Sequence, residues 1–230
     1  MSPQLPLAFR FPPDQQFDAF HGQDATRTLV RNVASGFSRD WLYLSGPPAS
    51  GKTHLLIAAC ATSRARDENP LYLPLPAVAG RLDQALQGHE GSALVCLDGL
   101  EAIAGNHDDE VALFHFHNAA RERDMRLVYS ALAMPAGLPF VLPDLVSRLE
   151  QCTRLALEPI SEDGRRAVLR ARASRRGLEL DDAVLDYLFR RVGRDLGTLT
   201  TLLDRLDRES MAAQRRLTVP FLKSVIERET

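Results

Sequence analysis

The chain has 230 residues, of which 45% are hydrophobic and 25% are charged, and its formal net charge is −2. This length and composition predict a globular protein with one medium domain, or with a large domain that carries a small one. The near-neutral charge excludes a global electrostatic attraction to nucleic acid or to an anionic membrane.

The three cysteines are odd in number and lie far apart, at Cys60, Cys96 and Cys152. They predict neither a disulfide framework nor a metal knuckle, and Cys96 stands inside an apolar run that we expect in the core. No apolar run approaches the roughly 18 residues that span a bilayer. The amino terminus also lacks the pattern of a signal peptide. We therefore expect a cytoplasmic protein that makes no contact with a membrane.

Residues 1–16 hold four prolines and little hydrophobic periodicity, which predicts a flexible or extended arm. Inside the arm, "PQLPLAF" sets Gln4, Leu5, Leu7 and Phe9 in a Q-L-x-L-x-F pattern. The pattern resembles peptides that dock on bacterial sliding clamps, and the prolines would hold it extended before binding. Alternatively, the arm folds back on its own domain as an edge strand or as a cover for an apolar patch.

Beyond the arm, short apolar runs alternate with stretches of helical pattern. The runs are WLYLSG (41–46), PLYLPL (70–75), SALVCLDGL (92–100), RLVYSAL (126–132) and TRLALEP (153–159). Buried runs separated by helices predict a parallel five-stranded sheet covered on both faces. We therefore expect an α/β base domain over residues 17–159.

After Pro159 the strand pattern stops. The remaining apolar residues repeat at helical spacing, and polar residues stand where helices would begin. The expected helices are 184–192 behind an Asp181 cap, 196–206, and 221–226 behind a Thr218 cap. They predict a small all-α lid domain over residues 160–230.

The segment "GPPASGKT", residues 46–53, follows a predicted strand and opens a predicted helix. It fits G-x-x-x-x-G-K-[ST], in which backbone amides curl around a phosphate and the helix amino terminus adds positive potential. In this pattern Lys52 reaches the terminal phosphates, and the Thr53 hydroxyl binds Mg²⁺. The expected nucleotide contacts are Gly46, Pro47, Pro48, Ala49, Ser50, Gly51, Lys52, Thr53 and His54.

The metal also needs an acid at the end of a neighbouring strand, and "ALVCLDGL" supplies Asp98 after mostly apolar residues. We expect Thr53 and Asp98 to hold Mg²⁺; the alternative is an aspartate that only caps a turn. Hydrolases of this class place a second acid directly after the first, to orient the attacking water. This chain has Gly99 there and Glu101 two residues further on. Intrinsic ATP hydrolysis should be weak or absent unless Glu101 takes that role.

A phosphate loop, a strand-end acid and a helical lid together resemble the AAA+ ATPases, and more narrowly the nucleotide-binding domain of the bacterial initiator DnaA. "QFDAFHG" is similar to the linker that backs the adenine in that family, which implies contacts from Phe17 and Phe20. "LDGLEAIAG" resembles the family's metal-binding strand with the turn after it. "DLVSRLEQCTRLALEPI" resembles its arginine-finger segment, and the resemblance puts the finger on Arg148; the alternative is an arginine that only forms a surface salt bridge.

The lid ends in "LDRLDRESMAAQRRLTVPFLKSVI", which resembles the DnaA-related regulatory inactivators called Hda. This resemblance implies an ADP-bound AAA+ adaptor that acts with the DNA sliding clamp to trigger ATP hydrolysis by DnaA. Two positions depart from the family pattern. The lid sensor arginine falls on Gly197, with Arg194 one turn earlier as a substitute, and the sensor of the fourth strand falls on Ser130. Both departures favour a weak hydrolase.

Two other function classes stay open: an autonomous AAA+ ATPase, such as a helicase or clamp loader, and a DnaA-like protein that binds DNA. Gly99 and Gly197 count against the first. The mild net charge and the lack of a DNA-reading domain after the lid count against the second. We expect ADP or ATP with Mg²⁺ as ligands, and DnaA and the clamp as partners. DNA would be contacted through the clamp, and a homo-oligomer is compatible with these expectations.

The first helix of the predicted lid is crowded with arginines. They are Arg165, Arg166, Arg170, Arg172, Arg175 and Arg176. Such a cluster predicts either a solvated face or a contact with DNA phosphates or an acidic partner.

Overall fold

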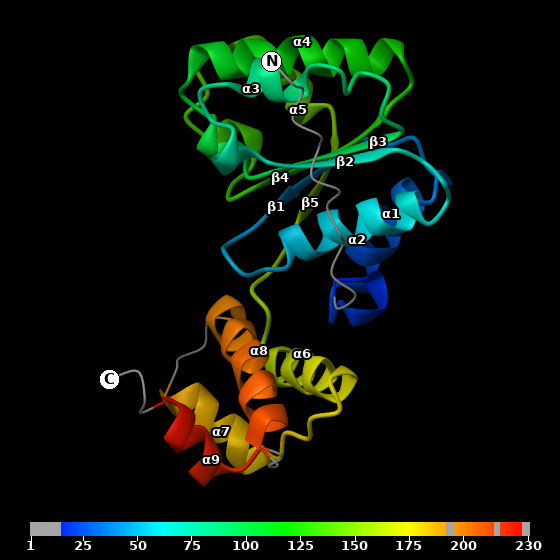
Figure 1. Ribbon diagram of the computed structural model, residues 1–230. Helices are drawn as coiled ribbons and strands as arrows, with labels where there is room; N and C mark the ends of the chain where they lie inside the picture. The colour runs from blue at the N-terminus through cyan, green and yellow to red at the C-terminus, as the bar shows by residue number, and fades with distance from the viewer. Residues whose placement is uncertain (1–14, 192–195, 214–216, 227–230) are drawn as a thin grey trace, which may run out of the picture. The chain divides into compact units, whose positions relative to one another are not determined.

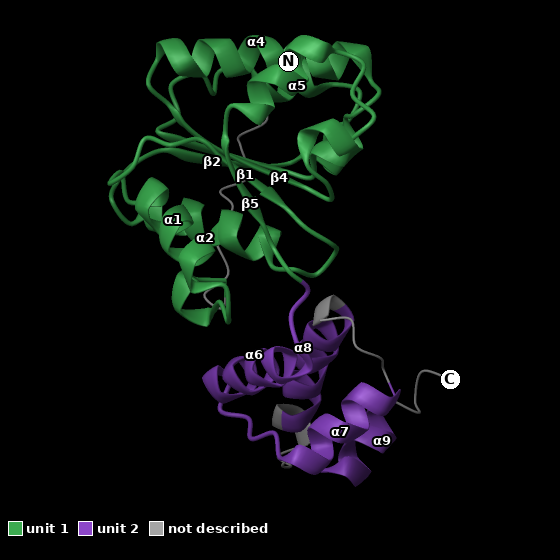
Figure 2. Cartoon of the chain, turned by 180° about the vertical axis from the view of Figure 1, so that it is seen from behind, with its two compact units in different colours: residues 1–158 green, residues 159–230 purple. Residues whose placement is uncertain are grey.

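The computed structural model describes residues 15–191, 196–213 and 217–226. The chain divides into two compact units, residues 1–158 and 159–230 (Figure 2). A sheet between two layers of helices makes up the first unit, and the described part of the second is helical. The predicted architecture, an α/β base with a small all-α lid, is confirmed.

Five parallel strands form the sheet, in the order β2-β3-β4-β1-β5 (Figure 1). Their bounds are β1 Leu42–Ser45, β2 Pro70–Pro74, β3 Leu94–Asp98, β4 Arg126–Ala131 and β5 Thr153–Ala156. Each lies within a run that the sequence predicts. Because β4 and β5 flank β1, the chain reverses its direction across the sheet beside β1, and ligands of such sheets bind outside the carboxyl ends at that point.

Helices cover both faces, as a parallel sheet requires. On one face lie α1 (Asp24–Ala34) and α2 (Lys52–Arg64), and on the other α3 (Leu82–Leu86), α4 (His107–Glu122) and α5 (Pro143–Glu150) (Figure 1). Short 3-10 helices join them: η1 Phe17–Ala19, η2 Leu75–Ala77, η3 Leu100–Ala102 and η4 Pro135–Gly137.

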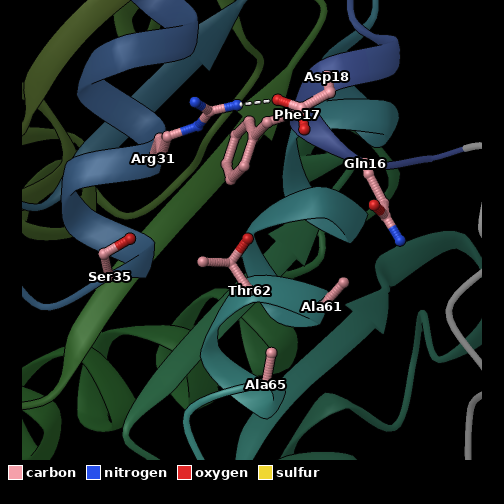
Figure 3. Close-up of a pocket in the computed structure, with 8 residues that line it drawn as sticks. All are labelled: Gln16, Phe17, Asp18, Arg31, Ser35, Ala61, Thr62 and Ala65. Carbon is pink, nitrogen blue, oxygen red and sulfur yellow. Dashed lines mark hydrogen bonds and ion pairs between the residues drawn. The ribbon is translucent and has the colours of Figure 1, made fainter.

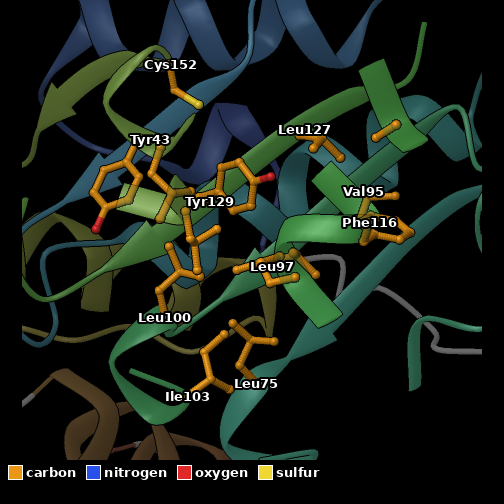
Figure 4. Packing of buried hydrophobic residues seen from close by; sticks show 14 of the residues in the cluster. Tyr43, Leu75, Val95, Leu97, Leu100, Ile103, Phe116, Leu127, Tyr129 and Cys152 are labelled. Atoms are coloured by element: carbon orange, nitrogen blue, oxygen red, sulfur yellow. The ribbon is translucent and has the colours of Figure 1, made fainter. Parts of the chain in front are cut away.

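Successive side chains along each strand point to opposite faces of the sheet, so they pack into two cores, one on each face. Tyr43 and Tyr129 pack with the side of α3, α4 and α5 (Figure 4), whereas Leu44 and Val128 pack with the side of α1 and α2. Strands β1 and β4 are buried throughout. Strand β5 is mostly exposed, so the expectation that every run is buried is wrong for β5, which forms an edge of the sheet.

The second unit has its own core, built from the apolar residues with helical spacing. Its helices are α6 Glu162–Arg175, α7 Asp182–Arg191, α8 Leu196–Ala213 and α9 Val219–Ile226. Both predicted caps are confirmed: Asp181 Oδ1 accepts from the Val184 amide at 2.7 Å, and Thr218 Oγ1 accepts from the Phe221 amide at 3.4 Å.

In the described parts of the chain, no helix combines the length and the apolar character that crossing a bilayer requires. All three cysteines are free and buried. Cys96 is fully buried, as its place inside an apolar run predicts.

Candidate nucleotide-binding site

The phosphate loop, residues 46–53, joins the carboxyl end of β1 to the start of α2. Helix α2 begins at Lys52, directly after Gly51, whose φ is 97°. A Cβ at Gly51 would lie 2.6 Å from the Phe20 ring, and a Cβ at Gly46 would lie 2.5 Å from the Leu157 carbonyl oxygen. Only glycine fits such close approaches. The two glycines of the motif are therefore required by packing before any ligand is considered.

Ala49 adds strain to the same loop. Its φ is 59°, in the left-handed region, which costs a non-glycine residue on the order of 1–2 kcal/mol. Strained backbone of this kind concentrates at functional sites. The loop's shape is therefore held by its surroundings and not by local preference.

The Lys52 ammonium lies inside the loop. Its Nζ donates to the carbonyl oxygens of Gly46 at 2.6 Å and Pro47 at 2.9 Å, and the residue is 8% exposed. Burial lowers the pKa of Lys52, while the carboxylates of Glu101 and Asp98 act in the opposite direction. A partly desolvated cation at a helix amino terminus is suited to bind phosphate, because the anion supplies the opposite charge that the carbonyl oxygens do not provide.

Strands β3 and β4 bring an acid and a hydroxyl beside the loop. Ser130 pairs in register with Leu44 of β1 on one side and with Asp98 of β3 on the other. Asp98 Oδ2 accepts a hydrogen bond from Thr53 Oγ1 at 2.8 Å, and Asp98 Oδ1 accepts one from Ser130 Oγ. Ser130 Oγ also accepts from the Gly99 amide at 3.0 Å. Thr53 and Asp98, which the sequence predicts to act together, thus form one cluster with Ser130.

Thr53 and Asp98 fit a magnesium ion in both chemistry and spacing. Each offers oxygen, the ligand that Mg²⁺ prefers. Octahedral Mg²⁺ at about 2.0–2.1 Å from its ligands separates neighbouring oxygens by about 2.9 Å, and Thr53 Oγ1 lies 2.8 Å from Asp98 Oδ2. A bound ion would neutralise charge on the phosphates of the nucleotide.

Tyr72 is a member of this cluster that sequence reasoning missed. Its hydroxyl donates to Asp98 Oδ2 at 2.8 Å. Burial, followed by the charge of Asp98, raises the pKa of Tyr72, so the hydroxyl keeps its proton. The register of β2 against β3 sets Tyr72 opposite Cys96, two residues before Asp98. No motif marks Tyr72; the pairing of β2 with β3 is the signal that identifies it.

Glu101 lies near the cluster but is held by the neighbouring strand. Its Oε2 accepts from the Leu132 amide, just after β4, at 3.1 Å. Its charge still acts on the loop, where it opposes the lowering of the Lys52 pKa by burial. The position directly after Asp98 is Gly99, with φ 90°, and it offers no carboxylate.

The two linker aromatics play different roles. Phe20 covers Gly51 and meets the His54 ring edge-on, with 5.5 Å between ring centroids. Phe17 lies below the guanidinium of Arg31, which is 5.2 Å from its ring centroid. Phe20 and His54 therefore stand next to the phosphate loop.

Phe17 instead lines a cavity of about 310 Å³ between α1 and α2 (Figure 3). Ala61 and Ala65 line the same cavity from the far end of α2. Because α2 rises by about 1.5 Å per residue, Ala61 lies roughly 14 Å along the helix from Lys52. This cavity is separate from the phosphate loop, so Phe20 is the better placed of the two to approach a nucleotide.

Comparison with known proteins finds a family match for the lid and a fold match for the chain. The Hda lid domain matches residues 162–226, nearly the whole described part of the second unit. Residues 162–226 match the Hda lid domain, and the chain as a whole has the AAA+ fold. Its lid is matched by sequence, and its base by fold.

Several solved structures share the fold of this chain. Domain III of the Thermotoga maritima replication initiation protein DnaA has a TM-score of 0.77 at 20% identity, covering 94% of this chain and 97% of that one. AMPPCP-bound DnaA from Aquifex aeolicus has a TM-score of 0.71 at 20% identity, covering 85% of this chain and 66% of that one. The match thus spans just under two thirds of the Aquifex chain. The Thermotoga maritima RuvB Holliday junction branch migration motor has a TM-score of 0.65 at 18% identity, covering 95% and 73%.

Arg148 lies near the amino ends of the strands, at the end of the sheet opposite the phosphate loop. It is in the last turn of α5, just before β5, whose first amide, at Thr153, donates to the Trp41 carbonyl oxygen at 2.8 Å. That contact marks the amino ends of β5 and β1, whereas the phosphate loop leaves the carboxyl end of β1. The length of β1, about 13 Å at 3.3 Å per residue, separates these two ends of the sheet. The backbone of Arg148 therefore lies well away from the phosphate loop of its own chain.

The lid arginines find acidic partners inside the lid. Arg166 pairs with Asp186 of α7 at 2.6 Å, and Arg176 pairs with Asp204 of α8. Arg170 likewise pairs with Asp182. Much of the cluster's charge is therefore balanced within the lid, which favours a solvated face over a surface for DNA.

Several predicted residues lie outside the described part of the chain. They are Gln4, Leu5, Leu7 and Phe9 of the arm, and Arg194 of the lid. Gly197 is the second residue of α8.

Proposed function

We propose that this Hda-like protein is an ADP-bound regulatory adaptor. Together with the DNA-loaded sliding clamp, it stimulates ATP hydrolysis by the initiator DnaA and so restrains re-initiation of DNA replication. The observation that carries the proposal is the separation of Arg148 from the chain's own phosphate loop, in a protein whose lid matches Hda. An arginine so placed is suited to act on a nucleotide bound by another protein and not on one in its own loop.

The nucleotide site would hold its ligand through residues of the loop and its neighbours. Lys52 would bind the terminal phosphate, and Thr53 and Asp98 would hold Mg²⁺, while Phe20 and His54 would approach the nucleoside. Aquifex aeolicus DnaA, which shares the fold, is AMPPCP-bound. Gly99 in place of a second acid, and Glu101 bonded to the Leu132 amide, favour a chain that retains ADP over one that turns ATP over.

Arg148 would supply its charge in trans. An arginine finger stabilises the negative charge that develops on the transferred phosphoryl group, and it raises the rate by ~10³ to 10⁵. The Arg148 side chain is half-buried at the end of α5. A short helix fixed on the core at Leu145 and Leu149, both fully buried, would hold the guanidinium in a defined place.

The clamp would be bound by the arm. The pattern of Gln4, Leu5, Leu7 and Phe9 supports this part of the proposal. So few anchors predict an affinity near micromolar, about −8 kcal/mol. A ring-shaped clamp offers more than one site, and simultaneous contact with DnaA would add effective concentration.

The test combines two measurements. The nucleotide that co-purifies is identified by chromatography after denaturation, and ATP hydrolysis by DnaA is measured with clamp-loaded DNA and this protein. We expect bound ADP, strong stimulation by the wild type, and loss of stimulation with Arg148→Ala. Arg64→Ala is the control, since Arg64 is an exposed arginine at the end of α2 on the other face of the sheet.

The alternatives give different results in the same experiment. Steady ATP consumption by the protein alone would support an autonomous ATPase. Binding to DNA in the absence of the clamp would support a DnaA-like DNA-binding role. Full stimulation by Arg148→Ala would remove Arg148 from the proposal.

A further inference from the structure

The Asp98 carboxylate is surrounded by three hydroxyl donors. Thr53 and Tyr72 each donate to Oδ2 at 2.8 Å, and Ser130 donates to Oδ1. A carboxylate oxygen has two lone pairs, so Oδ2 is fully used and Oδ1 keeps one. A metal ion or a metal-bound water that approaches Oδ2 must therefore displace one of its two donors.

Thr53 and Ser130 can keep their bonds when a metal binds. The Thr53 oxygen can face the ion while its proton still points to Asp98. Ser130 is fixed between Asp98 and the Gly99 amide, which donates to Ser130 Oγ at 3.0 Å. Ser130 itself donates to Asp98 Oδ1 and not to Oδ2. At Oδ2, the oxygen that faces Thr53, Tyr72 is therefore the donor whose bond conflicts with the metal.

The position of Tyr72 allows its hydroxyl to leave Asp98. It stands on β2, an edge strand of the sheet, and its side chain is half-buried. Water at this edge can replace Asp98 as acceptor at modest cost. Because burial and the Asp98 charge raise the pKa of Tyr72, the hydroxyl remains a donor across the working pH range and does not leave by ionising.

We propose that the Tyr72 hydroxyl competes with Mg²⁺ for Asp98. Tyr72 therefore raises the Mg²⁺ concentration that is needed to increase the affinity for nucleotide. The inference rests on the proposed nucleotide site. It adds a residue from the sheet edge, outside the phosphate-loop motif, that sets how firmly the metal is held. A loosely held metal agrees with a chain that keeps nucleotide and does not hydrolyse it.

The test uses the full chain, freed of nucleotide, and a fluorescent ADP analogue. Its affinity is measured from EDTA through a series of buffered free Mg²⁺ concentrations. In Tyr72→Phe we expect the half-maximal Mg²⁺ concentration to fall about tenfold, because a hydrogen bond to a charged acceptor is worth at least this factor. The affinity in EDTA should match that of the wild type, since the phosphate loop is untouched.

Tyr129→Phe is the matched control. It removes a tyrosine hydroxyl from β4, where the bond goes to His117 Nδ1 at 3.0 Å and not to Asp98, so its Mg²⁺ midpoint should equal the wild-type value. Tyr72→Leu, which also lacks the hydroxyl, should reproduce the shift and covers the case in which Tyr72→Phe folds poorly. Thermal melting checks the fold of each variant.

An unchanged or higher midpoint in the Tyr72 variants, with ADP still bound in EDTA, would overturn this inference and leave the nucleotide site standing. A wild-type chain that binds no ADP at any Mg²⁺ concentration would overturn the nucleotide site itself, and this inference with it.

Discussion

The Gln23 side-chain amide holds the backbone of Glu158 by two hydrogen bonds. Gln23 Nε2 donates to the Glu158 carbonyl oxygen at 3.3 Å, and the Glu158 amide donates to Gln23 Oε1 at 3.2 Å. Glu158 is the last residue of the first unit. The residue before it, Leu157, supplies the carbonyl that excludes a side chain at Gly46. Gln23 therefore fixes the strand exit that borders the phosphate loop.

Gln23 itself has φ 51°, so its two replacements should differ. Gln23→Ala loses both hydrogen bonds and keeps the backbone strain, and we expect it to lower the free energy of unfolding by about 1–2 kcal/mol. Gln23→Gly loses the same bonds but relieves the left-handed strain, so it should be more stable than Gln23→Ala by about 0.5–1 kcal/mol. Urea denaturation measures both values. Equal stability of the two variants would argue against the strain.

Lys52→Ala tests the phosphate loop. The variant removes the ammonium that lies between the loop carbonyls, and nucleotide affinity should fall at least tenfold, because charge-assisted contacts to phosphate are among the stronger hydrogen bonds. Isothermal calorimetry with ADP gives the affinity. Lys223→Ala is the control, since Lys223 is the chain's other lysine and lies on α9 in the second unit. Unchanged affinity in Lys52→Ala would dismiss the assignment.

His117 should make stability depend on pH. His117 is fully buried, and its Nδ1 lies 3.0 Å from the Tyr129 hydroxyl oxygen. Its Nε2 has no hydrogen-bond partner among the described residues. Burial, and then the charges of Arg121 and Arg148, lower the pKa of His117 from 6.5 to about 4. The unfolded chain takes up this proton first as the pH falls, so stability is lost between pH 6.5 and about pH 4.

The loss through His117 should total about 3 kcal/mol, since each pKa unit corresponds to 1.36 kcal/mol. Urea denaturation at a series of pH values should show a shallower decline for His117→Gln than for the wild type, whatever its stability at pH 7. His115→Gln, two residues away and exposed, should keep the wild-type slope. Parallel pH profiles for His117→Gln and the wild type would contradict the shifted pKa.

Deleting residues 1–9 tests the arm. We expect the melting temperature to change little and binding to the sliding clamp, measured by surface plasmon resonance, to disappear. The reason is that Gln4, Leu5, Leu7 and Phe9 supply the proposed clamp contacts. A large loss of stability with clamp binding retained would mean that the arm is part of the fold.

Local pattern was enough to predict the elements of this protein. Five apolar runs gave five strands, helical spacing gave the lid, and the two predicted caps, Asp181 and Thr218, accept the expected amides. The phosphate-loop motif likewise predicted where α2 begins. These features depend on residues close in sequence, whose backbone preferences and hydrophobic spacing act within a few positions.

Only the tertiary structure decided which strands are neighbours. The order β2-β3-β4-β1-β5 brings Ser130 and Asp98 beside the phosphate loop, sets Tyr72 on Asp98 and leaves β5 exposed at an edge. The helix before β5 places Arg148 near the amino ends of the strands, away from the loop. Each of these relationships joins residues far apart in the chain. A parallel strand can pair with several partners at similar local cost. The choice among these partners depends on how the helices cover the two faces of the whole sheet. No single segment of the sequence contains that information.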